Sequence, residues 1–303
     1  MGNHQARQMI KETFLSSGLD DGGVIIHTFG FGRDHDPELM TSIADLTDGN
    51  FFFIDKLDEV DEAFVESLGA LQTSVAENAQ FFIKPEQSEY LQGVEIVKAY
   101  GDESMWKQEG QVFITKSPSL ITGRQKDFVL ELKIPKVAKP GNIQGKVKVA
   151  SCQVILSLAD GKQVIKNANL KIYLIPEDAK DFNSEEDNKE VMKNYYRVKG
   201  AMLMQDAGSK ADQGEYEEAK QILKDFKESV ENSAVKDDEL IKNMMKDMEK
   251  SMEYVSEDVY GSYGRQNLMG NQRAQMRQQG NLDSKALLTN VHISNMREIL
   301  ADL

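Results

Sequence analysis

An aspartate–histidine–aspartate sequence at positions 34–36 follows an apolar run at 24–29. Two carboxylates and an imidazole are groups that can together bind a divalent cation. The loop after a buried strand of a parallel sheet is also the usual place for a ligand. Asp34, His35 and Asp36 are therefore candidate metal ligands. The interpretation that we favour is a polar loop in which Asp36 caps the next helix and no metal is bound.

The same region supplies candidate contacts for a protein partner. Two apolar runs, at 24–29 and 51–54, are each followed by polar residues. Loops at this edge of a parallel sheet are where such folds recognise other molecules. The candidate partner-binding residues in these loops are Arg33, Asp34, His35 and Asp55.

Motifs for other kinds of chemistry are incomplete. Gly30-Phe31-Gly32 lacks the third glycine and the Lys-Ser/Thr pair of a phosphate-binding loop. His27 lies within an apolar run, which favours a core histidine over a ligand. The single cysteine, Cys152, excludes an internal disulfide and a cysteine-based zinc site. We therefore predict no catalytic residue, no cofactor and no enzymatic activity.

Helices and strands alternate over residues 1–78. Apolar residues at helical spacing occupy 5–17, and the runs at 24–29 and 51–54 are typical of buried strands. Between these runs, Pro37 suits the first turn of a helix, and a further helix follows the second run. Short connections between alternating helices and strands indicate a parallel sheet. We predict a partial, doubly wound α/β sheet here.

Residues 79–176 change to a strand pattern. Apolar runs and apolar–polar alternation predict strands at 81–84, 94–99, 111–115, 127–134, 146–158 and 163–174. Proline and glycine separate these segments, and Asp160-Gly161 is a hairpin signal. Regular short strands of this kind predict an antiparallel β-sandwich.

The remainder of the chain is predicted to be helical, after an acidic linker at 177–188. Residues 189–259 have the spacing of a helical bundle. The segment at 260–282 is rich in glycine, glutamine and asparagine, which is typical of a low-complexity segment that is mobile unless docked. A last amphipathic helix is predicted at 283–303.

Composition excludes some classes of partner. The chain has 303 residues and a net charge of −14, which argues against nucleic acid because phosphate binding needs clustered lysine and arginine. It has no apolar run long enough to span a membrane, and its N-terminus lacks the apolar stretch of a secretory signal. One cysteine suits a reducing compartment. We expect a cytoplasmic protein with protein partners.

These residues together resemble the C-terminal part of a von Willebrand factor A (VWA) domain. The matching positions are 26–32, 34–36, Leu39, Met40, Ile43, Ala44, Gly49 and 51–54. Residues 123–135 are similar to the β-rich segment that follows the VWA domain in a group of intracellular eukaryotic proteins. Residues 189–280 resemble the helical Vwaint region of those proteins, with Gly214, Ala219 and Leu223 at matching positions.

The resemblance implies a truncated VWA unit. VWA domains bind a metal through a D-x-S-x-S motif, a later threonine and a further aspartate, and none of these can be matched here. Plant relatives carry a RING finger and act as ubiquitin ligases, but one cysteine cannot form a RING. The expected function is a non-catalytic protein-interaction or scaffold module. The partial sheet leaves three expectations open: the chain is a piece of a longer protein, a partner completes the sheet, or its edge is covered internally, with the helix at 283–303 as the candidate cover. The alternatives are an accessory part of a ubiquitin-ligase-like protein and the C-terminal fragment of a metal-dependent VWA adhesion protein.

Overall fold

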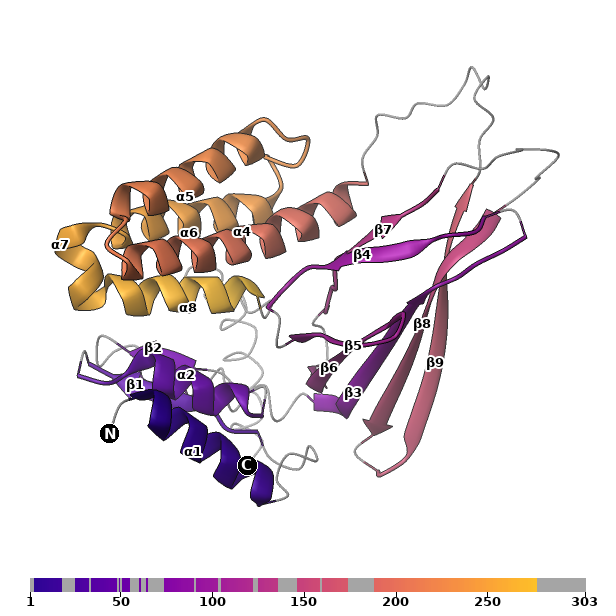
Figure 1. The fold of residues 1–303 in the computed structure, drawn as a ribbon, viewed down its shortest axis with the longest axis horizontal. Helices are drawn as coiled ribbons and strands as arrows, with labels where there is room; N and C mark the ends of the chain where they lie inside the picture. The colour runs from indigo at the N-terminus through magenta and orange to yellow at the C-terminus, as the bar shows by residue number, and fades with distance from the viewer. Residues whose placement is uncertain are drawn as a thin grey trace, which may run out of the picture. The chain divides into compact units, whose positions relative to one another are not determined.

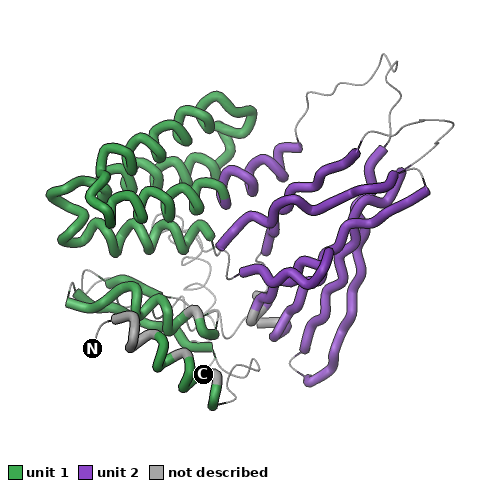
Figure 2. The backbone as a smooth tube through the Cα atoms, viewed as in Figure 1, with its two compact units in different colours: residues 1–74, 121–124, 199–303 green, residues 75–120, 125–198 purple. Residues whose placement is uncertain are grey.

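The computed structural model describes most of the chain, and its contacts divide it into two compact units (Figures 1 and 2). Unit 1 comprises residues 1–74, 121–124 and 199–303, and unit 2 comprises residues 75–120 and 125–198. The residues described are 3–17, 25–32, 34–47, 49, 51–54, 60, 64, 74–89, 91–102, 105–121, 125–135, 146–158, 160–173 and 188–276. Nearly all of the predicted linker at 177–188 and all of the predicted helix at 283–303 lie outside these ranges.

Unit 1 contains the predicted parallel pair of strands. Its N-terminal elements are α1 (Asn3–Ser16), β1 (Thr28–Phe31), α2 (Pro37–Asp45) and β2 (Phe51–Ile54). β1 and β2 pair in parallel, with Thr28 opposite Phe51 and Phe31 opposite Ile54, which confirms the predicted parallel arrangement. Phe52 and Ile54 are buried, with Phe29 and Val60 packed against them.

β1 begins later than the apolar run predicts. The amide of Ile26 donates to Thr47 Oγ1 at 2.7 Å instead of joining a strand ladder. A Cβ atom on Gly49 would lie 1.7 Å from the Ile26 carbonyl oxygen, so the turn into β2 requires glycine at this position. The residues before Thr28 are therefore held by the α2–β2 turn, and pairing starts only where β2 is alongside.

Unit 2 contains antiparallel strands in two sheets. One sheet has the order β5 (Lys107–Glu109), β6 (Val112–Ile121), β3 (Ser74–Pro85), β8 (Lys146–Leu158) and β9 (Gln163–Tyr173). The other pairs β4 (Glu95–Ala99) with β7 (Leu130–Lys133). Leu91, Val94, Val147 and Val149 form a buried cluster against Leu132 of β7 and Ile172 of β9. This cluster joins the two sheets, as expected for a sandwich core.

The helical region contains five α-helices and one π-helical turn among the described residues. These are α4 (Lys189–Asp212), α5 (Tyr216–Glu231), α6 (Glu239–Tyr254), α7 (Glu257–Val259), the π-helical turn at Tyr260–Gly264, and α8 (Arg265–Met276). α5 buries Ala219, Leu223, Phe226 and Val230, which recur every three or four residues on one face. Met244 and Met248 of α6 are fully buried. The helical region predicted from residue 189 onward is therefore present.

The segment predicted at 260–282 as low-complexity chain differs from that expectation over Tyr260–Met276, where it forms the π-helical turn and α8. Leu268 and Met276 are 2% and 4% exposed, so a few apolar residues are enough to hold this polar helix in place. A Cβ atom on Gly264 would lie 2.2 Å from the Tyr254 carbonyl oxygen. Glycine therefore serves close packing here, although glycine-rich composition is typical of mobile chain.

Candidate interaction site

The candidate site lies at the carboxyl ends of β1 and β2, where a parallel sheet usually binds its ligands. Gly32 ends β1 with a φ of 70°, a left-handed conformation that favours glycine, and its amide donates to the Ile54 carbonyl oxygen at 3.0 Å. Phe31, the last residue of β1, is 59% exposed. The edge therefore presents a large aromatic side chain beside a glycine whose amide is bonded to β2.

Asp36 caps the helix that follows. Its Oδ1 atom accepts hydrogen bonds from the amides of Glu38, at 2.9 Å, and Leu39, at 3.1 Å. Pro37 occupies the first turn of α2, where its missing N–H is not needed. The predicted helix cap is thus confirmed, and one oxygen of this candidate metal ligand has a structural role.

His35 is packed among aromatic rings. Its imidazole lies 5.7 Å from the Phe51 ring and 5.6 Å from the Phe53 ring, between ring centroids. A Cβ atom on Gly30 would lie 2.3 Å from His35 Nε2, so the ring rests directly over this glycine. Both ring nitrogens are buried without a hydrogen bond of ordinary geometry. Burial lowers the pKa of His35 below its usual 6.5, and the Gly32 backbone and Asp36 partly oppose this shift.

The predicted polar residues therefore have different environments. Asp34 is exposed, whereas Arg33 and Asp55 lie outside the described residues. Asp34, His35 and Asp36 do not converge on one point, and no three His, Cys, Asp or Glu side chains in the described part of the chain are placed to hold a metal ion. Of the four candidate partner contacts, Asp34 is the one whose carboxylate the structure presents to solvent.

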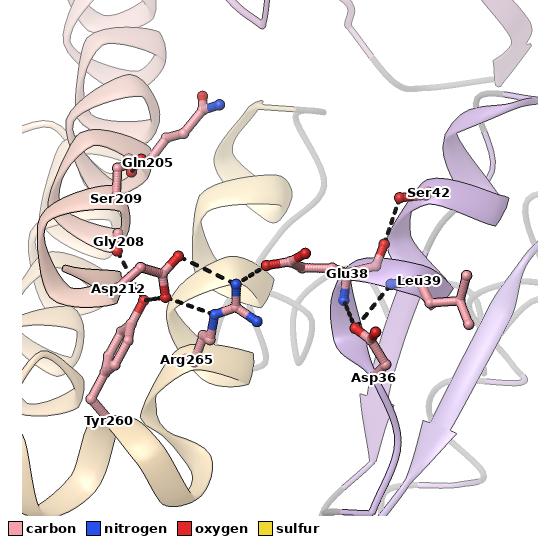
Figure 3. Close-up of polar contacts among 10 residues, drawn as sticks. All are labelled: Asp36, Glu38, Leu39, Ser42, Gln205, Gly208, Ser209, Asp212, Tyr260 and Arg265. Carbon is pink, nitrogen blue, oxygen red and sulfur yellow. Dashed lines mark hydrogen bonds and ion pairs between the residues drawn. The ribbon is translucent and has the colours of Figure 1, made fainter. Parts of the chain in front are cut away.

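An ion-pair network extends from α2 to the helical region (Figure 3). Arg265, the first residue of α8, pairs through Nη2 with Glu38 of α2. The same guanidinium binds Asp212 of α4 through two contacts, from Nε at 2.8 Å and from Nη2 at 3.3 Å. One arginine thus joins carboxylates from two other helices of unit 1.

Tyr260 completes this network. Its hydroxyl oxygen lies 2.8 Å from Asp212 Oδ1 and 2.9 Å from the Gly208 carbonyl oxygen. Burial, followed by the hydrogen bond to Asp212, raises the pKa of Tyr260 far above its usual value. The neutral hydroxyl therefore remains a hydrogen-bond donor at any physiological pH. The network positions helices, because its polar groups are satisfied by one another.

Sequence reasoning did not find this network. Glu38, Asp212 and Tyr260 carry no motif, and Arg265 was assigned to the low-complexity segment. Their helices bring them together from distant parts of the chain, and side-chain pairs of this kind leave no periodic pattern in the sequence. Leu268 and Met276 are eight residues apart, a spacing that places both on one side of a helix, and this was the signal in the sequence that could have indicated α8.

No helix among the described residues combines the length and apolar character needed to cross a membrane. Comparison of the sequence with protein-family models and with curated proteins gives no match. Among solved structures, a von Willebrand factor type A protein from Catenulispora acidiphila is similar, with a TM-score of 0.55 and 14% sequence identity. The similarity covers 83% of this chain and 57% of that structure, so the chain spans little more than half of its neighbour's length. The chain therefore has a VWA-like fold.

Proposed function

We propose that this chain is a non-catalytic protein-interaction module of VWA type, which contacts its partner through Phe31 and Asp34. The observation that carries the proposal is the 59% exposure of Phe31 at the carboxyl end of β1. Aromatic anchors surrounded by polar groups are the residues that dominate protein interfaces. Asp34, exposed in the loop that follows β1, supplies a charge that can orient the partner.

The polar groups around Phe31 support binding over catalysis. The Oδ1 atom of Asp36 serves the helix cap, and both nitrogens of His35 are buried beneath aromatic side chains. General acid–base work needs a titratable group within reach of a substrate, and of Asp34, His35 and Asp36 only Asp34 is exposed. A rim with one exposed aromatic residue and one exposed carboxylate suits recognition of another protein surface.

A second part of the proposal concerns the sheet. Among the described residues, β1 has β2 as its sole hydrogen-bonded neighbour. Two strands alone form a marginal sheet, so we propose that a strand from a protein partner pairs with the other edge of β1. The sequence carries no D-x-S-x-S motif, and we accordingly assign this module to the VWA type without the metal-ion-dependent adhesion site. We further propose that residues 189–280 are a Vwaint-like region and that the protein acts in the cytoplasm.

The test is an affinity purification from cells with the wild-type chain, the Phe31→Ala variant and the Asp34→Ala variant. Partners recovered with the wild type are identified by mass spectrometry and then purified for direct binding. We expect Phe31→Ala to weaken binding by about 2 kcal/mol and Asp34→Ala by less, because buried aromatic anchors contribute most to an interface. The matched control is Val191→Ala, which removes another exposed apolar side chain, 57% exposed, from α4. Equal recovery of partners by wild type and Phe31→Ala would refute this site.

A further inference from the structure

The outer strand of the five-stranded sheet is exposed on both of its faces over its central residues. β9 is the last strand in the order β5-β6-β3-β8-β9, so it has β8 on one side and no described strand on the other. Every residue from Ile165 to Lys171 is exposed. An unpaired edge presents backbone N–H and C=O groups that can accept a further strand.

This edge is basic although the protein is acidic. The chain carries a net charge of −14, yet β8 and β9 together contain four lysines and no aspartate or glutamate. Lys148 of β8 lies directly opposite Lys171 of β9. Like charges in directly opposed positions destabilise a sheet. The pair therefore attracts negative charge to this face.

One nearby carboxylate and one aromatic ring satisfy part of this charge. Glu86 binds Lys148 at 3.1 Å and Lys84 at 3.6 Å. Lys146 lies over the Tyr173 ring, 4.9 Å from its centroid. By contrast, no ion pair joins Lys166 or Lys171 to another residue in the part of the chain that the structure describes. Two lysines of the edge strand itself thus remain available to an incoming group.

Apolar side chains accompany these lysines. Ile165 is 55% exposed, Leu170 51% and Tyr173 63%. Together with Lys166 and Lys171 they define what we call the β9 edge. Large exposed apolar residues beside unpaired backbone are the features that a strand-adding partner uses for affinity and side-chain specificity. Pairing of two copies through this edge would bring lysines close to lysines, which disfavours self-association.

We propose that the β9 edge binds an acidic, extended segment of a partner protein, which adds as a further strand beside β9. Backbone hydrogen bonds to β9 would supply affinity. Lys166 and Lys171 are five residues apart and so lie on opposite faces of β9, where each would select a carboxylate on its own face of the incoming strand. This surface belongs to unit 2 and goes beyond the proposed contacts of Phe31 and Asp34.

The experiment measures binding of the full chain to a short fluorescein-labelled peptide of glutamate and valine, by fluorescence anisotropy. The glutamates are placed so that both faces of the extended peptide carry carboxylates. We expect saturable binding that weakens at higher salt, because the carboxylates are recognised by exposed lysines. The double variant Lys166→Glu/Lys171→Glu should lower the affinity at least about tenfold. Lys236→Glu/Lys242→Glu makes the same change in net charge on the helical region and should bind as the wild type does.

A second peptide separates strand addition from simple attraction of charge. N-methylation of alternate backbone amides removes their hydrogens and leaves every carboxylate in place. We expect this peptide to lose binding. Equal binding of methylated and unmethylated peptides, or equal weakening by both double variants, would overturn the proposal. Binding to phosphatidylserine vesicles through Lys166 and Lys171, without binding to the peptide, would also overturn it. Self-association of the chain through the β9 edge, without peptide binding, would do the same.

Discussion

Arg265 of α8 forms an ion pair with Glu38 of α2, at the first turn of the helix that follows β1. The same guanidinium holds Asp212 of α4 in a two-contact arrangement. The guanidinium group suits this position because its planar set of donors can face two carboxylates at once. The α/β elements and the helices of unit 1 are thereby tied together by one side chain that is 30% exposed.

Replacing Arg265 should destabilise unit 1. Arg265→Ala removes contacts to two carboxylates and should lower the free energy of unfolding by about 1–2 kcal/mol, with partial exposure limiting the effect. Arg265→Lys keeps the charge without the planar fork and should recover only part of that loss. Urea unfolding followed by circular dichroism measures both. The control is Lys224→Ala, at an exposed position of α5. If this control lost as much free energy of unfolding as Arg265→Ala does, the two ion pairs of Arg265 would not be the cause of the effect.

Tyr260→Phe should cost about 1 kcal/mol of unfolding free energy, because it removes the single hydroxyl proton that the Asp212 carboxylate and the Gly208 carbonyl oxygen share as acceptors, while the ring is kept. The matched control is Tyr216→Phe, whose ring lies 6.0 Å from that of Tyr260, between centroids. Thermal unfolding of the three proteins at equal concentration provides the comparison. If the two variants lose the same free energy of unfolding, the contact of the Tyr260 hydroxyl with Asp212 does not contribute to stability.

His35 should make stability depend on pH. Its pKa is lowered in the folded protein, so the unfolded chain binds more protons than the folded one below the usual pKa of 6.5. The contribution of His35 is therefore complete above pH 6.5, and it is lost as the pH falls from 6.5 toward the lowered folded pKa. His35→Leu should flatten this part of the stability–pH curve. Parallel curves for wild type and variant between pH 5 and 7 would show that the ring is not held neutral by burial.

Two glycines should respond oppositely to replacement by alanine. Gly49→Ala places a Cβ atom 1.7 Å from the Ile26 carbonyl oxygen and should cost more than about 2 kcal/mol. Gly270→Ala lies within α8 with nothing within 4 Å of the new atom, and should stabilise the protein by up to about 1 kcal/mol. Differential scanning calorimetry of the two variants checks both signs. A stable Gly49→Ala protein would mean that the turn into β2 can shift.

Local patterns in the sequence were enough to predict several elements. β8 spans Lys146–Leu158, the range predicted from its residues, because a stretch with several valines and an isoleucine between turn residues favours a strand over other secondary structure. Asp36 before Pro37 predicted the start of α2, since capping depends on neighbouring residues alone. The short strand β5 was not predicted, because its three exposed residues, Lys107–Glu109, show no apolar pattern and depend on pairing with β6.

The site was less accessible from sequence. The exposure of Phe31 depends on where β1 ends and what packs beside it, whereas the sequence shows only an apolar residue between two glycines. His35 was a candidate ligand by residue type, whereas packing against Phe51 and Phe53 decides its environment. Contacts between distant elements, such as Arg265 with Glu38, follow from the fold, so residue type alone could not indicate them.

The π-helical turn at Tyr260–Gly264 determines how this region tolerates changes of length. A helix rotates by about 100° for each residue, so deleting one residue from the turn would rotate all of α8 by about that angle. Leu268 would leave the core, and Arg265 would turn away from both of its carboxylates. Substitution at Gly261, where a Cβ atom meets nothing within 4 Å, keeps the spacing intact. Over evolutionary time, in-frame deletions in this turn should therefore be selected against more strongly than most substitutions.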